Sequence, residues 1–165
     1  MTREVVVNAG PLIHLAAIGR FQLLEALFGF VNVPDAVYDE VVTCGMGQAG
    51  APEVEVALDA GWMRRRAVVD RVGVALLLGK LHVGEAEAIV LARGLGCGVL
   101  LDDATARAAA IHMGLTVSGT IGILLLARRR ALIGTLEPEL DKLLASGFRL
   151  NRVLYERLIS NLTNL

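Results

Sequence analysis

The stretch that most limits what this chain can fold into runs from Gly98 to Ala110 and reads GVLLDDATARAAA. Its first four residues have the length and apolarity of a strand buried on both faces, and segment 104–110 is rich in strong helix formers. Asp102 and Asp103 therefore fall in a β-to-α turn, at the edge of an open α/β sheet where ligands bind. One aspartate could cap the helix there, but a cap explains only one of the two carboxylates.

The rest of the chain repeats this alternation of short apolar runs and helical segments, separated by glycine and proline. We predict strands at residues 4–8, 30–33, 62–69, 98–101 and 115–117, a loop at 44–52, and helices at 12–18, 21–28, 35–43, 53–60, 72–78, 85–93, 104–110, 119–130, 136–145 and 150–162. Such alternation predicts an α/β fold with a mostly parallel central sheet flanked by helices. Residues 1–165 suit a single domain, because no repeat or linker interrupts them.

The high hydrophobic fraction, 55%, requires that a membrane span be considered. The best candidate is segment 108–127, which lacks Asp, Glu, Lys and Arg. Its middle contains several polar groups and two glycines, so a helix, a short strand and a second helix fit it better than a span. The first residues do not resemble a secretion signal, because Glu4 follows Arg3 closely and Asn8 interrupts the apolar run. We therefore expect a cytoplasmic protein.

Cysteine and charge exclude several classes of function. Cys44 and Cys97 have neither a CxxC spacing nor a histidine pair at zinc-finger intervals, so we expect two reduced thiols. The net charge of −1 gives no overall basicity that would indicate nucleic-acid binding. Two arginine triplets, 64–66 and 128–130, could contact phosphates, although such runs are more often solvated surface.

Glu40 is an acid on a helical face that is otherwise apolar. On the helix that Pro34 begins, positions three and four apart share a face, so Glu40 joins Ala36, Val37 and Val41. Burying a carboxylate costs free energy of desolvation, which a function would explain. The alternative is a glutamate at the margin of the apolar stripe whose side chain reaches outward to water. The sequence alone leaves both interpretations open.

Asn8 and Glu85 are two further polar side chains at a predicted strand end and a predicted helix start. Glu85 lies in the first turn after Gly84, where interaction with the positive helix end explains a lone glutamate well. Asn8 lies at the carboxyl end of the first strand, where asparagine is also a common helix cap. Each signal is modest when it is taken alone.

Taken together, these polar positions can converge on one cleft of a parallel α/β fold. Carboxylates brought together repel one another unless a divalent cation neutralises them, and hard oxygen ligands suit Mg²⁺ or Mn²⁺. Attack of water on a phosphodiester is the chemistry that such a site serves most naturally. The residues concerned are Asn8, Glu40, Glu85, Asp102 and Asp103.

The order of motifs in the chain resembles the PIN-domain superfamily of metal-dependent ribonucleases, in a prokaryotic branch related to VapC-type toxins. The matching pieces are VVVNAGPLIHLAAIG, VPDAVYDEV, GEAEAIVLA, LLDDATAR, GTIGILLLA and LDKLLASGFRL, which together cover nearly the whole chain. The resemblance implies a PIN-like three-layer sandwich. It also implies a metal-dependent nuclease whose substrate is RNA.

The resemblance assigns roles to individual residues. The first strand of the family usually ends in a metal-binding aspartate, and Asn8 occupies that position here. Glu40, Glu85 and Asp103 match the remaining metal-binding acids, with Asp102 beside them. Ser118 and Thr120 match a hydroxyl group often found near the site, although helix capping explains them equally well. An asparagine carbonyl can bind Mg²⁺, but the loss of one negative charge should weaken binding.

Two hypotheses follow from the sequence. The preferred one is a Mg²⁺-dependent, single-strand-selective ribonuclease, with the toxin of a toxin–antitoxin pair as one form of it. The alternative, motivated by Asn8, is a PIN-fold module that binds RNA or a partner protein without cleavage. The expected partners are RNA, an antitoxin protein and a second copy of the chain in a homodimer. No catalytic role is assigned to His14, His82 or His112, because their spacing is irregular.

Overall fold

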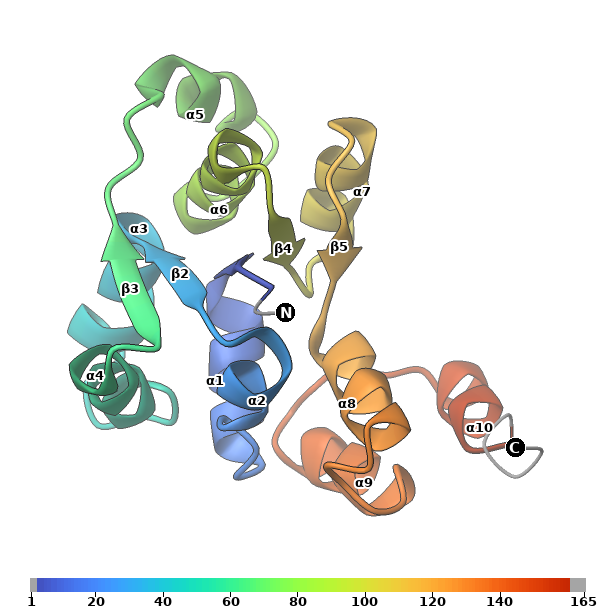
Figure 1. Cartoon of the computed structure of the whole chain (residues 1–165). Helices are drawn as coiled ribbons and strands as arrows, with labels where there is room; N and C mark the ends of the chain where they lie inside the picture. The colour runs from blue at the N-terminus through green and yellow to red at the C-terminus, as the bar shows by residue number, and fades with distance from the viewer. Residues whose placement is uncertain (1–2, 161–165) are drawn as a thin grey trace.

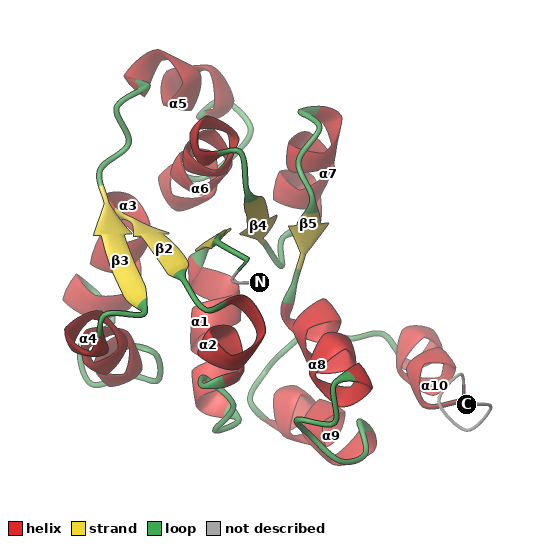
Figure 2. Ribbon diagram, in the orientation of Figure 1, coloured by secondary structure: helices red, strands yellow, loops and turns green. Residues whose placement is uncertain are grey.

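The computed structural model describes residues 3–160, which fold around a five-stranded sheet (Figures 1 and 2). The strands are β1 (Val5–Val7), β2 (Val31–Pro34), β3 (Met63–Arg66), β4 (Gly98–Leu100) and β5 (Val117–Ser118). They lie in the order β3-β2-β1-β4-β5, and every pair in the described sheet is parallel. The predicted α/β class is confirmed, and the predicted mostly parallel sheet is wholly parallel over the described residues.

Each predicted helix has a counterpart, with ends that differ by a few residues. The described helices are α1 (Ala9–Ala17), α2 (Leu23–Phe28), α3 (Asp35–Tyr38), the π-helical turn η1 (Asp39–Thr43), α4 (Ala51–Ala60), α5 (Arg71–Leu77), α6 (Val83–Leu95), α7 (Ala104–His112), α8 (Thr120–Arg129), α9 (Glu137–Ala145) and α10 (Arg152–Ser160). Residues 161 and 162 of the last predicted helix lie outside the described residues. No residue of α10 is fully buried, so this helix is more exposed than its amphipathic pattern suggests.

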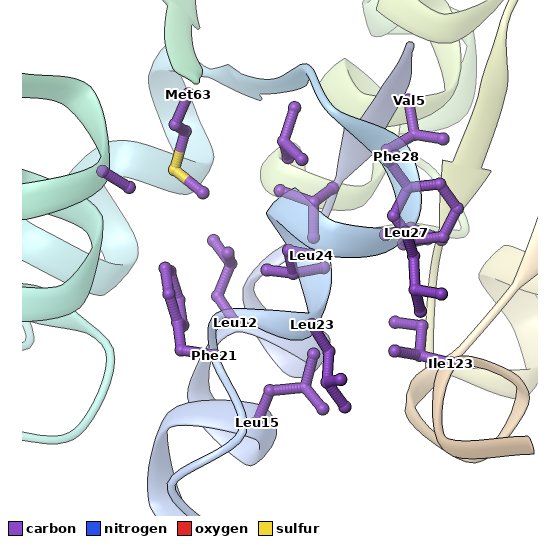
Figure 3. Close-up of a cluster of buried hydrophobic side chains, with 14 of the residues drawn as sticks. Val5, Leu12, Leu15, Phe21, Leu23, Leu24, Leu27, Phe28, Met63 and Ile123 are labelled. Carbon is purple, nitrogen blue, oxygen red and sulfur yellow. The ribbon is translucent and has the colours of Figure 1, made fainter. Parts of the chain in front are cut away.

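Alternate residues of β1 supply two separate cores. Val5 and Val7 join a large cluster formed with α1, α2, α4 and α8, part of which Figure 3 shows. Val6 points the other way, into a smaller cluster with α6 and α7. Successive side chains of a strand point to opposite faces of the sheet, so the sheet lies between two helical layers. This is the three-layer sandwich expected from the sequence.

The strand order places a crevice beside β1. The chain passes from β1 to β2 and β3 on one side, and then returns to β4 and β5 on the other side. Loops that leave β1 and β4 therefore diverge at the carboxyl edge of the sheet. Ligands of open α/β sheets bind at such a switch point. Asn8 directly follows β1, and the pair Asp102-Asp103 follows β4, so both flank this point.

Two predicted boundaries are wrong for identifiable reasons. Helix α1 begins at Ala9, three residues earlier than predicted, because Pro11 is tolerated in a first turn that needs no N–H donor there. Strand β3 ends at Arg66 instead of residue 69. Arg66 pairs with Pro34, the last residue of β2, whose nitrogen cannot donate to a ladder.

None of the helices within residues 3–160 is long and apolar enough to cross a membrane. Segment 108–127 instead contains the end of α7, the short strand β5 and most of α8, as the sequence predicts.

Candidate functional site

A pocket of about 190 Å³ opens at the carboxyl edge of the sheet, where β1 and β4 end. We call it the edge pocket. Its lining brings together the turn after β1, η1, the start of α6 and the turn after β4. The lining residues are Asn8, Ala9, Gly10, Glu40, His82, Glu85, Asp102 and Asp103. The five polar residues that the sequence predicts at one cleft are thus assembled there.

Asn8 carries the most informative atom of the edge pocket. The residue is 7% exposed, and its Oδ1 is buried without a hydrogen-bond partner among residues 3–160. Its backbone N–H donates to the carbonyl of Leu100 on β4, which fixes the turn after β1. A buried polar atom without a partner is rare in folded proteins and calls for an explanation.

Glu40 lies opposite Asn8 across Gly84. A Cβ atom built on Gly84 would lie 3.2 Å from Oε2 of Glu40 and 3.3 Å from Oδ1 of Asn8. The glycine therefore leaves open the space toward which both oxygens point. The sequence predicts Glu40 on a buried face, but the residue as a whole is exposed, because Val37 and Val41 cover the core while its carboxylate extends into the pocket.

The electrostatics of Glu40 reflect this position. Desolvation by burial of its carboxylate raises the pKa of Glu40, and repulsion from Glu85 raises it further. The nearby His82 has the opposite effect and lowers the pKa of Glu40. Two carboxylates that repel each other across a pocket indicate a site that favours a positive charge.

Glu85 is buried in the first turn of α6. Its Oε2 accepts a hydrogen bond of 3.0 Å from the backbone N–H of His82, the residue that precedes the helix. No hydrogen bond within the described chain involves its other oxygen, Oε1, which remains available to a ligand.

The two aspartates after β4 have different structural tasks. Oδ1 of Asp103 accepts from the backbone N–H of Ala106 at 2.8 Å and so caps α7. Asp102 instead accepts from the backbone N–H and from Oγ1 of Thr120, both at 2.7 Å, and from Nδ1 of His14 at 2.9 Å. The possible cap noted in the sequence is therefore Asp103, while Asp102 connects α1, β4 and α8.

Some of the hydroxyl residues and histidines lie at the edge pocket or against its acids, and the others lie away from it. Thr120 is fully buried against Asp102, whereas Ser118 does not line the edge pocket and lies with its Oγ close to Gly122. His112 is exposed on α7 and lines a different hollow. His82 lines the edge pocket, and this position could not be predicted because the spacing of His82 to the acids follows no helical or strand period.

Glu87 is a further buried acid on α6. It is 4% exposed, its Oε2 accepts from the backbone N–H of Ala36 at 2.8 Å, and its Oε1 pairs with Arg71 at 2.6 Å. Because Ala36 is in the first turn of α3, Glu87 fixes the helix that leads to Glu40. This contact links the positions of the two elements that carry Glu40 and Glu85.

The first arginine triplet serves the protein itself. The guanidinium of Arg65 pairs with Asp35 and lies 4.1 Å over the ring of Tyr38. Arg66 donates to Asn32, and Arg64 lies over Phe30. These contacts support strand β3 and give no sign of a phosphate site. Cys44 and Cys97 are free thiols, as predicted.

The donor atoms of the edge pocket fit a hard divalent cation. Within residues 3–160, no three His, Cys, Asp or Glu side chains stand close enough together to hold an ion by themselves. Repulsion between Glu40 and Glu85 opposes such an approach when no cation is present. The unpartnered Oδ1 of Asn8 and the open space over Gly84 provide a neutral oxygen and room for an ion.

Comparisons with known proteins agree with the fold. The family model DUF3368, described as a PIN domain, matches residues 4–164. A solved structure of a PilT N-terminus domain protein from the hyperthermophilic archaeon Sulfolobus solfataricus P2 is similar, with a TM-score of 0.58 and 18% identity over 75% of this chain and 92% of that chain. At this identity the likeness concerns the fold alone. No curated protein matches the chain significantly. With its family model matched over nearly the whole sequence, the chain belongs to the DUF3368 family of PIN domains.

Proposed function

We propose that this PIN domain is a metal-dependent ribonuclease that hydrolyses phosphodiester bonds of RNA. The observation that carries the proposal is the buried, unpartnered Oδ1 of Asn8 in a pocket lined by Glu40, Glu85 and Asp103. Membership of the PIN-domain family supports the same conclusion. A cation can bind a buried carbonyl oxygen and the surrounding carboxylates at the same time.

In this proposal Asn8, Glu40, Glu85 and Asp103 hold Mg²⁺ or Mn²⁺ through their oxygens. When bound, such an ion polarises a phosphoryl oxygen and makes water a stronger nucleophile at neutral pH. Asp103 can use Oδ2, because the cap of α7 occupies only Oδ1. Asp102 supports the wall of the pocket, since its two oxygens already accept three hydrogen bonds.

The size of the edge pocket supports a phosphate as the group that enters it. Its volume of about 190 Å³ is below the roughly 300–1,000 Å³ of pockets that enclose small-molecule ligands. A phosphate, a cation and a few waters fill such a volume, because each water occupies about 30 Å³. Sugars and bases then remain outside. An extended single strand can bring one phosphate to the pocket in this way, so we propose single-stranded RNA as the substrate.

Cleavage of single-stranded RNA by the purified protein, with and without Mg²⁺, tests the proposal. We expect EDTA to abolish cleavage. Glu40→Ala and Asp103→Asn should each lower the cleavage rate by about tenfold to a hundredfold. Asparagine is a good helix cap, so the second variant changes the charge while it keeps the start of α7. Glu55→Ala on α4 is the control, because Glu55 is exposed and does not line the pocket. Unchanged cleavage in both site variants would sink the assignment.

The second candidate function is RNA or protein binding without cleavage, and Asn8 favours it. An asparagine supplies one negative charge less than the aspartate that PIN domains usually carry at this position, which weakens the attraction for a cation. If the wild type is inert and Asn8→Asp creates metal-dependent cleavage, this candidate replaces the first. A wild type that is already active at physiological Mg²⁺ excludes it.

The resemblance of the sequence motifs to VapC-type toxins extends the proposal to protein partners. Large exposed apolar side chains lie on α5, where Val72 is 73% exposed and Leu76 is 80% exposed. A second copy of the chain or an antitoxin protein would remove such a surface from water. Light scattering of the purified protein tests the dimer, since a species of 17.5 kDa would contradict it. We also expect the protein to act in the cytoplasm, where RNA is available.

A further inference from the structure

His82 is the one residue of the edge-pocket lining whose side chain can carry a positive charge, counting all eight described residues of that lining. Its backbone N–H donates to Oε2 of Glu85, so the main chain alone serves the start of α6. The residue is exposed, and its imidazole ring makes no hydrogen bond to any part of residues 3–160. The ring is therefore free to meet a group that approaches from solvent.

The charge of the lining creates a need for such a group. Glu40, Glu85, Asp102 and Asp103 supply four carboxylates, and one divalent cation neutralises only part of their charge. An RNA phosphate that enters the edge pocket then meets a net negative surface. Hydrogen-bond donors at the rim offset this repulsion, because bonds to a charged phosphate are stronger than bonds between neutral groups.

The position of the ring suits this task. His82 lines the edge pocket together with Glu40 and Glu85, and it directly precedes α6, so it borders the space that a phosphate would enter. The other side chains of the lining that could donate are limited to the amide of Asn8. Asn8 lies at the buried end of the pocket, whereas His82 lies at the open end.

We propose that His82 donates a hydrogen bond to a non-bridging oxygen of the RNA phosphate that enters the edge pocket. The inference rests on the proposed function, because it takes RNA as the ligand. A neutral imidazole carries one N–H donor in either tautomer, so the contact does not require a change of protonation. His82 is thus a substrate-binding residue that leaves the ligands of the cation unchanged.

Three variants test this role. His82→Ala removes the ring, His82→Gln keeps a side-chain N–H donor, and His112→Ala is the matched control on the exposed end of α7. The backbone bond to Glu85 persists in the first two variants, because it does not use the side chain. Fluorescence anisotropy with a labelled single-stranded RNA in Ca²⁺ gives the dissociation constant, and titration with Mn²⁺ gives the affinity for the cation.

We expect His82→Ala to weaken RNA binding by about three- to tenfold, which corresponds to one lost hydrogen bond. His82→Gln should recover part of this loss, and His112→Ala should bind as the wild type does. The Mn²⁺ affinity should stay the same in all three variants. Under cleavage conditions the loss should appear mainly in KM.

Two results would overturn the inference. One is RNA binding by His82→Ala that equals that of the wild type. The other is a loss of Mn²⁺ affinity in His82→Ala that is as large as its loss of RNA affinity, which would mean that His82 acts only by positioning Glu85. A wild type that binds RNA but does not cleave it contradicts the proposed ribonuclease and leaves the His82 contact testable by the same binding assay. A wild type that binds no RNA contradicts both.

Discussion

Among single residues, Asp102 accepts more hydrogen bonds than the other acids of the edge pocket. Replacing it should therefore lower the free energy of unfolding measurably. It accepts two bonds of 2.7 Å from the fully buried Thr120 and one of 2.9 Å from His14. Asp102→Ala should lower the free energy of unfolding by about 2 kcal/mol, because buried donors lose their acceptors. Thr120→Val removes only the hydroxyl bond and should cost about 1 kcal/mol. Equal losses in urea denaturation would contradict this division of roles.

In the absence of a cation, the charge of Glu40 should lower the stability of the folded protein. Burial and repulsion from Glu85 raise its pKa, so the folded protein binds the proton more tightly than the unfolded chain does. Stability from this residue therefore falls as pH rises through the raised pKa. Glu40→Gln should raise the free energy of unfolding at pH 7 in EDTA by less than about 1 kcal/mol, because solvent screens an exposed residue. The gain should disappear below about pH 4, where both states are protonated.

Apart from His82, the polar residues of the edge pocket were predictable from sequence as a set but not in their separate roles. Asn8 and Glu85 could be found because each lies at a strand end or in a first helical turn, and such positions converge in a parallel fold. Which of Asp102 and Asp103 caps α7 and which bonds to Thr120 depends on where α8 begins in space, which no local pattern encodes. His82 escaped because an exposed histidine before a helix has no periodic signal.

At the scale of elements, α6 contributes to the edge pocket through the absence of a side chain at Gly84. A Cβ there would crowd Oε2 of Glu40 at 3.2 Å and Oδ1 of Asn8 at 3.3 Å. Gly84→Ala should therefore lower Mn²⁺ affinity at least several-fold, while alanine itself favours the helix. Gly94→Ala is the control in the same helix, because a Cβ at Gly94 meets no atom within 4 Å. Titration with Mn²⁺ and thermal unfolding of both variants separate cation binding from stability.

The order and type of the elements follow from local sequence, whereas the π-helical turn does not. Apolar runs bounded by glycine and proline give β1, β2 and β4, because the inner strands of a parallel sheet are buried on both faces. The edge strands β3 and β5 are partly exposed. The turn η1 was predicted as ordinary helix. Just after it, Gly45 comes so close to the carbonyl of Val41 that a Cβ would not fit, a local backbone detail that the periodicity of apolar residues does not report. This turn carries Glu40, and π-helical turns are frequent at functional sites.

At the scale of the whole molecule, the edge pocket depends on helices that are far apart in the sequence. The switch point between β1 and β4 supplies Asn8 and the two aspartates, and the crossover through β2 and β3 supplies Glu40. The hydrogen bond from Ala36 on α3 to Glu87 on α6 holds the elements that carry Glu40 and Glu85 in place relative to each other. The pocket can therefore form only when the complete parallel sheet has formed, so loss of overall stability should also remove cation binding.

The ion pair between Arg20 and Glu139 fastens the C-terminal helices to the N-terminal ones. Arg20 follows α1, and its guanidinium donates to both oxygens of Glu139 on α9, at 2.6 and 3.1 Å. The bond with Arg20 holds the pKa of the buried Glu139 carboxyl below its usual range. Stability from this pair is thus present above the ordinary pKa of glutamate and is lost as pH falls through the lowered value.

Arg20→Ala should lower the free energy of unfolding by about 2–3 kcal/mol at neutral pH, because it leaves a buried carboxylate without its partner. The difference from the wild type should shrink at acidic pH, where protonation of Glu139 removes the charge that Arg20 compensates. Arg152→Ala is the control, since Arg152 pairs with Glu156 where both side chains are exposed and should change little. Urea denaturation at pH 7 and near pH 3 makes the comparison. A loss in Arg20→Ala that is independent of pH would show that packing of the arginine, rather than its charge, joins α1 to α9.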